Sequence, residues 1–168
     1  MPTNPVAMTA DEQAAFLNEP GMSLQLATMG ANGYPHLSAM WYVFTRGHLY
    51  FNTYGASQKG RNIARDPRVS CMVEAGKWYG ELRGVVLQGK VVQVTEQTEL
   101  DEVGLALIRR YPLPSPDITA EQLFAKTRLN AKRQVYRLET EHVYSWDHRK
   151  TEARQKRKGE GASETYRA

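Results

Sequence analysis

Short alternating segments joined by tight turns occupy residues 23–54 of this 168-residue chain. In the first segment, residues 24–28, larger apolar side chains alternate with smaller or polar ones, which is the period of a strand with one buried face. Asn32-Gly33 follows as a dipeptide that accepts positive φ easily, and the runs at 36–44 and 48–54 predict two further strands. Because turns this short connect antiparallel strands only, the segment predicts an antiparallel sheet.

The segments outside this region predict short helices and a few longer strands. A Thr9–Glu12 capping box begins the first helix, and Asp66-Pro67 ends the second. Helices are expected over 9–18, 57–66, 97–111 and 119–129, and strands over 69–75, 79–96 and 133–146. Gly84 and Gly89 inside the long strand predict a bend, a bulge or a close approach to the backbone, and a kink is expected near Thr140.

These elements together predict a mainly β fold with short helices, arranged as a small closed or split barrel. One domain is expected over residues 1–148, since the chain has no internal repeat. Residues 149–168 are polar, lack apolar periodicity and are expected to form a disordered tail.

Composition narrows the classes of function. The net charge of +4 is modest and is partly carried by the tail, so neither a nucleic-acid nor a membrane partner is expected. The single cysteine, Cys71, excludes an intramolecular disulfide, and its apolar neighbours predict a buried thiol. With no basic segment followed by an apolar one at the N-terminus, a cytoplasmic protein is predicted. No two histidines have metal-ligand spacing, so no metal site is expected.

The stretch "TYGASQKGRNIARDPR", residues 53–68, is the main candidate for an anion site. Ser57 is expected to cap a helix whose N-terminus offers free amides and the positive end of the macrodipole. Lys59 lies in the first turn, and Gly60 is expected to let an anion approach the backbone. Arg61-Asn62 stands where a P-loop has Lys-Ser/Thr, which argues against an NTPase. Taken alone, the stretch fits a phosphate site and a solvated basic helix face about equally well.

Aromatic side chains on the neighbouring strands are the second candidate. In "MWYVF", residues 40–44, adjacent large rings fall on opposite faces of a strand, and only one face can belong to a barrel core. The other rings must then cover a partner subunit or a flat ligand. Barrel aromatics can also stack nucleic-acid bases, but the cations gather at one helix rather than along a groove, which disfavours that alternative.

The combination "LATMGANGYPHLSAMWYVF…GHLYFNT…SQKGRNIARDPRVSCMVE…GVVLQGKVVQV" resembles the pyridoxamine 5′-phosphate oxidase-like flavin reductases. These are split-barrel proteins that bind FMN or the deazaflavin coenzyme F420. The resemblance covers roughly residues 16–94, and "VYRLETEHVYSWDHRK" is similar to the closing strand of the family. It implies a split β-barrel of the FMN-binding type and a homodimer with two cofactors in grooves between the protomers.

The resemblance also implies which residues contact the cofactor. Ser57 and Lys59 match positions that hold its phosphate, with Arg61 and Asn62 as helpers. Met40, Trp41 and Tyr42 match positions that line the ring, partly through backbone contacts, and Thr53 matches the end of the flavin-facing strand. Trp146 and Arg149 match positions that could reach a cofactor across the dimer. No catalytic residue is assigned, because a flavin or deazaflavin carries the hydride chemistry itself.

The function expected from this resemblance is hydride transfer between a bound F420 or FMN and a flat, unsaturated organic substrate. Arg61, Arg65 and Arg68 could hold the polyglutamate tail of F420, which favours the deazaflavin. The alternatives are an FMN-dependent oxidase or reductase of the same fold, and a non-catalytic module that binds flavin or heme. Gly84 stands where the vitamin-oxidising members carry glutamine, and "SWDHRK" lacks their closing motif, so oxidation of pyridoxamine phosphate is not expected.

Replacing Lys59 with alanine is expected to weaken cofactor binding by about 1–3 kcal/mol, the scale of a lost charge-assisted hydrogen bond. Fluorescence titration of the cofactor measures the change. Unchanged affinity in a variant whose circular dichroism is intact would show that the phosphate is held elsewhere.

Overall fold

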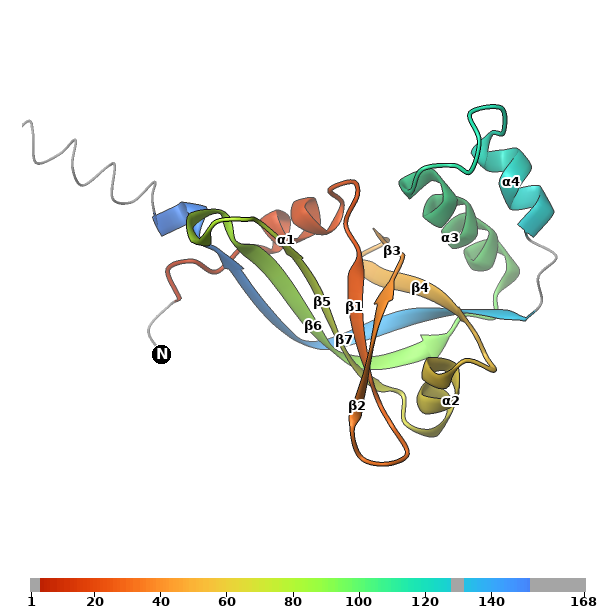
Figure 1. The fold of residues 1–168 in the computed structure, drawn as a ribbon, viewed down its shortest axis with the longest axis horizontal. Coiled ribbons are helices and arrows are strands. Elements are labelled where there is room, and N and C mark those ends of the chain that lie inside the picture. The colour runs from red at the N-terminus through yellow and green to blue at the C-terminus, as the bar shows by residue number, and fades with distance from the viewer. Residues whose placement is uncertain (1–3, 128–131, 152–168) are drawn as a thin grey trace, which may run out of the picture.

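The computed structural model describes residues 4–127 and 132–151 of the chain (Figure 1). Its strands are β1 (Leu24–Met29), β2 (Pro35–Met40), β3 (Tyr42–Thr45), β4 (His48–Tyr54), β5 (Arg68–Ala75), β6 (Arg83–Gln93) and β7 (Arg133–Asp147). Its α-helices are α1 (Ala10–Leu17), α2 (Gln58–Arg65), α3 (Gln97–Arg110) and α4 (Ala120–Thr127), and η1 (Tyr79–Glu81) is a short 3₁₀ turn.

The strands form one antiparallel sheet with the order β2-β1-β5-β6-β7-β4-β3. β2 and β3 are therefore the two edges of the sheet, although Trp41 alone separates them along the chain. Two edges joined by one residue must lie close together, so the sheet curls into a barrel, and in Figure 1 β1 and β2 cross in front of β6 and β7. The mainly β class and the antiparallel arrangement predicted from the sequence are confirmed.

The prediction of a single strand over 36–44 is wrong, because the structure divides this segment into two strands at Trp41. Residues before this break pair with β1, and residues after it pair with β4. The hydrophobic pattern runs through the break without interruption, and a change of hydrogen-bonding partner leaves no mark on such a pattern. The side chain of Trp41 is 61% exposed, whereas that of Tyr42 is fully buried.

The core fills the inside of the curled sheet. Every second residue of β1 and β5 points inward, and α1 covers one end of the barrel with Phe16 and Leu17. The capping box predicted at its start is present, since the Thr9 hydroxyl accepts from the Glu12 amide and the Glu12 carboxylate accepts from the Thr9 amide. Cys71 lies in this core as expected, and burial raises the pKa of its thiol to about 12.

The interior glycines of β6 lie at a bulge and at close approaches to β7, two of the features that the sequence predicts. The register between β6 and β7 shifts at Gln88/Gly89, which places the bulge near Thr140. A Cβ added to Gly89 would lie 2.0 Å from the carbonyl oxygen of Glu139, so the partner backbone requires glycine there. At Gly84 the indole of Trp146 occupies the space that a side chain would need, with ring atoms 2.1 Å from an added Cβ.

The first residues assigned to the tail are ordered. The guanidinium of Arg149 pairs with Asp147 at 2.6 Å, and the ammonium of Lys150 lies 2.6 Å from the Glu12 carboxylate and 2.7 Å from the Ala7 carbonyl. The packed part of the chain thus extends beyond the expected boundary at residue 148, through residue 151. The disorder expected for the rest of the tail concerns residues 152–168, which lie outside the described part. No helix among residues 4–127 and 132–151 is long and apolar enough to cross a membrane.

Replacing Gly89 with alanine is expected to destabilise the protein by about 1–3 kcal/mol, because the new Cβ forces β6 and β7 apart at the bulge. Urea unfolding gives the change in the free energy of unfolding. The control is Lys90→Ala at the exposed neighbouring position, which is expected to change stability by less than about 0.5 kcal/mol. Equal stabilities for the two variants would contradict the close approach.

Candidate functional site

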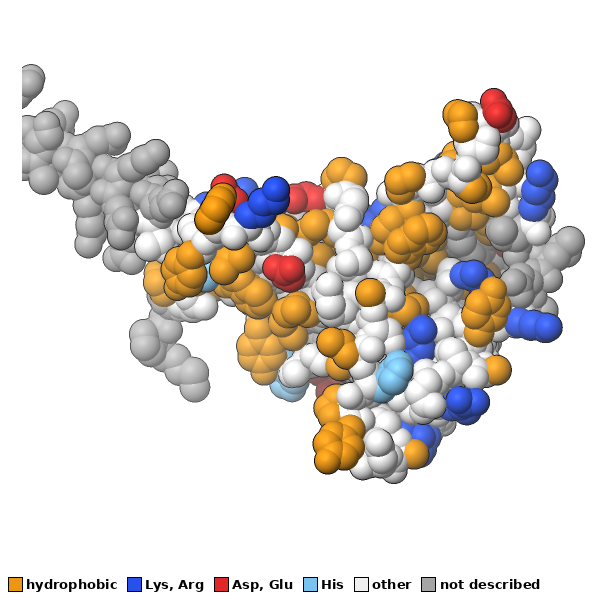
Figure 2. Space-filling view, in the orientation of Figure 1, with side chains coloured by type: hydrophobic (Ala, Val, Ile, Leu, Met, Phe, Trp, Pro, Cys, Tyr) orange, Lys and Arg blue, Asp and Glu red, His pale blue; other side chains and the backbone are white. Residues whose placement is uncertain are grey.

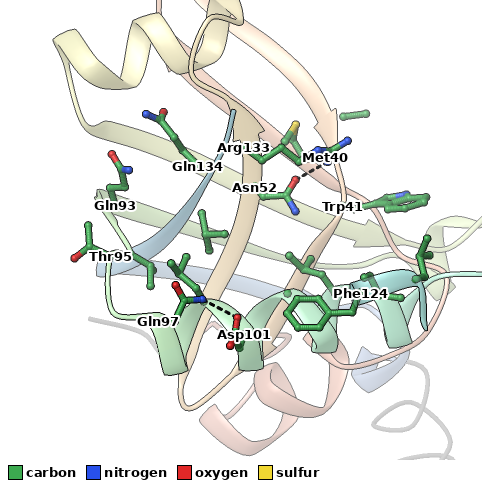
Figure 3. Close-up of a pocket in the computed structure, with 18 residues that line it drawn as sticks. Met40, Trp41, Asn52, Gln93, Thr95, Gln97, Asp101, Phe124, Arg133 and Gln134 are labelled. Atoms are coloured by element: carbon green, nitrogen blue, oxygen red, sulfur yellow. Dashed lines mark hydrogen bonds between the residues drawn. The ribbon is translucent and has the colours of Figure 1, made fainter. Parts of the chain in front are cut away.

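A groove of about 890 Å³ lies between the open side of the barrel and the α3–α4 pair (Figure 3). Met40 and Trp41 reach it from the junction of the two sheet edges, and Asn52 reaches it from β4. Opposite them, Leu107 of α3 and Phe124 of α4 supply apolar surface. Its lining is more apolar than polar, and its polar side chains come from β4 and β7 on one side and from residues 93–101 on the other. A cavity of this size and composition is typical of sites that bind small organic molecules.

Helix α3 forms one wall of the groove and is held on the sheet by packing and by a charged cluster. Val103 and Leu107 are buried against Val43, Tyr50 and Val94. These contacts confirm the amphipathic helix expected over 97–111.

The charged cluster lies beside this packing. One carboxylate oxygen of Glu99 accepts from the Tyr50 hydroxyl at 2.8 Å and from the Arg137 guanidinium at 2.9 Å. The hydrogen bond from Tyr50, followed by the bond and charge of Arg137, holds the pKa of Glu99 below its ordinary value of 4.5. The ionised carboxylate therefore fixes α3 to β4 and β7.

The aromatic end of the groove is built on Trp41. Its indole stacks on the Tyr111 ring, with centroids 4.5 Å apart and planes inclined by 6°. The Tyr111 hydroxyl accepts from the backbone amide of Tyr42 at 2.9 Å and lies 3.0 Å from the carbonyl oxygen of Met22. Trp41 is thus exposed but held in place, which is the arrangement that a platform for a flat ligand requires.

The polar end of the groove contains Asn52, Arg133 and Gln134. Arg133 donates to the Asn52 side chain at 3.0 Å, and its guanidinium carbon lies 4.7 Å from the centre of the Tyr54 ring (Figure 3). Arg133 is the one Lys or Arg among the described residues that line the groove. Arg133 is not among the site residues expected from the sequence, because the pairing of β4 with β7 brings together residues about 80 positions apart.

The start of α2 lies next to this polar end. In the β4–β7 register Thr53 faces Gln134, and Tyr54 faces Arg133, so the chain passes from the groove directly into the helix. Ser57 caps α2 as predicted, accepting from the Gly60 amide at 3.1 Å. The Ser57 hydroxyl lies 2.7 Å from the Tyr54 carbonyl, to which it donates. Its proton is thereby occupied within the chain, so a donation from Ser57 to a phosphate would require rotation of the hydroxyl.

Lys59 and Gly60 have different surroundings. The side chain of Lys59 is half-buried and makes no hydrogen bond or ion pair with any described residue. Gly60 is buried, and an added Cβ would lie 2.6 Å from the carbonyl oxygens of Tyr54 and Gly55. The expectation that Gly60 leaves room for an anion is therefore wrong, since its missing side chain makes room for the protein's own backbone.

Three of the expected contact residues point into the protein. Tyr42 is fully buried, donates its hydroxyl to the Leu17 carbonyl at 2.9 Å and has its pKa raised to about 12 by burial. Asn62 is also fully buried and donates to the Thr28 hydroxyl at 3.0 Å, which ties α2 to β1. Thr53 is buried, and its hydroxyl lies 3.1 Å from that of Ser57. In this conformation the Tyr42 and Asn62 side chains have no surface to offer a ligand.

The expected site residues thus fall in three places. Met40 and Trp41 line the groove, and the α2 residues, including the exposed Arg61, adjoin its polar end. Trp146 and Arg149 lie at the opposite end of β6 and β7, beside α1 (Figure 1). Within one protomer they are separate from the groove, and their contact with a cofactor across a dimer stays a prediction.

No group of three or more His, Cys, Asp or Glu residues capable of holding a metal ion lies within residues 4–127 and 132–151. The described lining of the groove contains neither histidine nor cysteine. Its lining offers an aromatic surface at Trp41, apolar contact and a few polar side chains, among them the charged Arg133 and Asp101. These are the features of a site that positions a ligand with reactivity of its own.

The chain belongs to the pyridoxamine 5′-phosphate oxidase family, whose model matches residues 9–147. A conserved hypothetical protein from Mycobacterium tuberculosis is similar in structure, with 38% sequence identity and a TM-score of 0.77 over 88% of this chain and 90% of that one. An F420 reductase is 26% identical, with a TM-score of 0.57 over 77% and 94% of the two chains. A heme storage protein from Vibrio cholerae shares the fold at 20% identity, with a TM-score of 0.63 over 80% and 92%. The search of curated proteins found no match.

Replacing Glu99 with glutamine is expected to lower the free energy of unfolding near neutral pH, because the ion pair with Arg137 is lost. The pKa of Glu99 is lower in the folded state, so the carboxylate stabilises the protein above pH 4.5 and loses this effect as pH falls through the lowered pKa. The difference between wild type and variant should therefore shrink as the pH falls below 4.5. Urea unfolding at several pH values tests this, and a difference independent of pH would contradict it.

Proposed function

We propose that this protein is an oxidoreductase that holds F420 or FMN and transfers hydride to a flat, unsaturated organic substrate. The observation that supports this function best is the continuity of the site. A rigid exposed indole at Trp41 and a polar end at Arg133 line the groove, and β4 leads from this polar end into α2, which carries an unpaired ammonium at Lys59. A cofactor with a flat ring system, a polar linker and a phosphate needs these three surfaces in this order.

Each surface has a separate task in the proposal. Trp41 and Met40 contact the ring and exclude water from it, and Tyr111 keeps the indole in position. Arg133 and Lys59 neutralise anionic groups of the ligand. The bound cofactor supplies the hydride chemistry, so the chain needs no acid–base pair of its own.

The choice between the two cofactors rests on few residues. Arg68 is paired with Asp66 at 2.7 Å, and Arg65 donates to the Met29 carbonyl and to Asn62, so both arginines already have partners. Arg61 makes one bond, to Gln58 at 3.3 Å, and is the freest of the three cations expected to hold a polyglutamate tail. The likeness to an F420 reductase supports the deazaflavin, and FMN is the alternative in the same groove.

Heme binding is the second candidate function, favoured by the fold shared with a heme storage protein. A heme in this groove would need an axial ligand, which is commonly histidine, cysteine or methionine. Met40 is the one sulfur-bearing residue in the described lining, and histidine is not among those residues. The groove therefore suits a flavin-like ring better than a heme.

A homodimer is also part of the proposal. On the outer face of the sheet, Leu37 is 66% exposed and Tyr144 is 55% exposed. The strand registers place Met72 and Val86 in the same row as Tyr144, and Leu37 lies in the neighbouring row. An exposed apolar sheet face of this kind is suited to contact a second copy of the chain.

Fluorescence titration with F420 and with FMN tests the proposed function. We expect micromolar or tighter binding of one cofactor. Arg133→Gln should weaken it about tenfold, the effect of losing a charged hydrogen bond. Arg46→Gln, in the exposed β3–β4 turn, is the matched control and should leave the affinity unchanged. If neither cofactor binds the wild-type protein at micromolar concentration, the proposal fails.

A further inference from the structure

A second cavity of about 330 Å³ lies beside the groove, where Trp41 meets the chain segment that follows α3. Its wall is made by Trp41, Ile108, Tyr111, Leu123 and the segment Pro112–Pro114. All of these side chains are aliphatic or aromatic. The polar side-chain groups among them are the Tyr111 hydroxyl, which is bonded to the backbone at Tyr42 and Met22, and the indole N–H of Trp41. The side chains of the cavity therefore offer a ligand mainly apolar contact.

The cavity is preformed. Tyr111 is buried, its hydroxyl makes three backbone contacts, and its ring fixes Trp41 by stacking. Pro112 and Pro114 restrict the backbone of the opposite wall, because each proline ring sets φ near one value. An apolar cavity whose walls are already fixed loses little conformational freedom when a ligand enters.

The cavity and the groove share Trp41, Ile108 and Leu123, so they are neighbouring compartments with one common wall. Figure 2 shows hydrophobic side chains gathered in this region, between β3 and the α3–α4 pair. One ligand can therefore occupy both spaces, with a flat polar part in the groove and an apolar extension in the cavity. When no ligand is bound, the apolar walls of the cavity stay in contact with water, which is unfavourable.

We propose that this cavity binds the aliphatic chain of an amphiphilic substrate whose flat part lies in the groove. This narrows the substrate of the proposed function to planar molecules that carry a hydrocarbon substituent. The inference depends on the proposed function only for the chemistry that takes place on the flat part. Binding of the chain itself depends on the apolar wall alone.

Calorimetric titration with 4-n-alkylbenzoates, from methyl to octyl, tests the proposal on the full chain without added cofactor. Complete burial of one methylene is worth about a fourfold change in affinity, so we expect about a two- to fourfold gain per methylene in this half-open cavity. The gain should stop once the cavity is full. An affinity that does not change with chain length would overturn the proposal.

Leu113→Trp, which fills the cavity from the loop, should abolish the dependence on chain length while leaving the affinity for 4-methylbenzoate unchanged. Leu113→Ser, a milder change, should reduce about twofold the factor by which each added methylene raises the affinity. Val92→Trp is the matched control, since Val92 is 46% exposed and lines neither cavity. The same chain-length dependence in all variants would overturn the proposal, as would a Leu113→Trp protein that loses its dimer in sedimentation, because a partner subunit would then cover this surface.

The two proposals fail in different ways. Loss of F420 and FMN binding with an intact chain-length dependence would refute the proposed cofactor and keep the chain-binding cavity. Cofactor binding with no chain-length dependence would refute the cavity and keep the proposed function.

Discussion

The closure of the barrel depends on a single residue that joins the two edges of the sheet. β2 and β3 are the outermost strands in hydrogen-bonding order, yet Trp41 alone separates them in the chain. The edges must therefore meet, and the backbone between them cannot belong to either ladder. The residue at the seam is left exposed while its neighbour Tyr42 enters the core. The most prominent surface of the candidate site is thus a direct product of the way the sheet closes.

The rest of the site is assembled around this seam by contacts between distant parts of the chain. Tyr111, at the end of α3, stacks on Trp41 and is hydrogen-bonded to the backbone beside it. Arg133 lies next to Asn52 because β7 pairs with β4. The sequence contains all of these residues, but their meeting is decided by strand order, which local patterns do not report.

Local features were predictable from the sequence because their causes are local. The capping box at Thr9, the cap at Ser57, the stop before Pro67 and the bulge near Gly89 all follow from the chemistry of a few adjacent residues. The break at Trp41 and the role of Gly60 were predicted incorrectly. The break depends on which distant strands pair with the residues on either side of Trp41. The role of Gly60 depends on how closely α2 lies against the backbone of Tyr54 and Gly55, which precede it in the chain. Of the expected site residues, Met40 and Trp41 line the groove, whereas Tyr42 and Asn62 are buried. Periodicity alone does not tell which face of the divided strand turns inward at Tyr42, and it does not show that Asn62 of α2 meets Thr28 of β1.

The two walls of the groove differ in how strongly the rest of the fold constrains them. The sheet wall is part of the barrel closure, so its backbone cannot change without opening the core. The helical wall is attached by the Glu99 cluster, by one apolar face of α3 and, for α4, by an exposed ion pair between Arg109 and Glu121. Substitutions on the groove side of α3 and α4 can therefore accumulate without loss of the barrel. The shape of the groove can thus change on its helical side while the barrel stays the same, and residues 97–127 are the part of the chain that sets this shape.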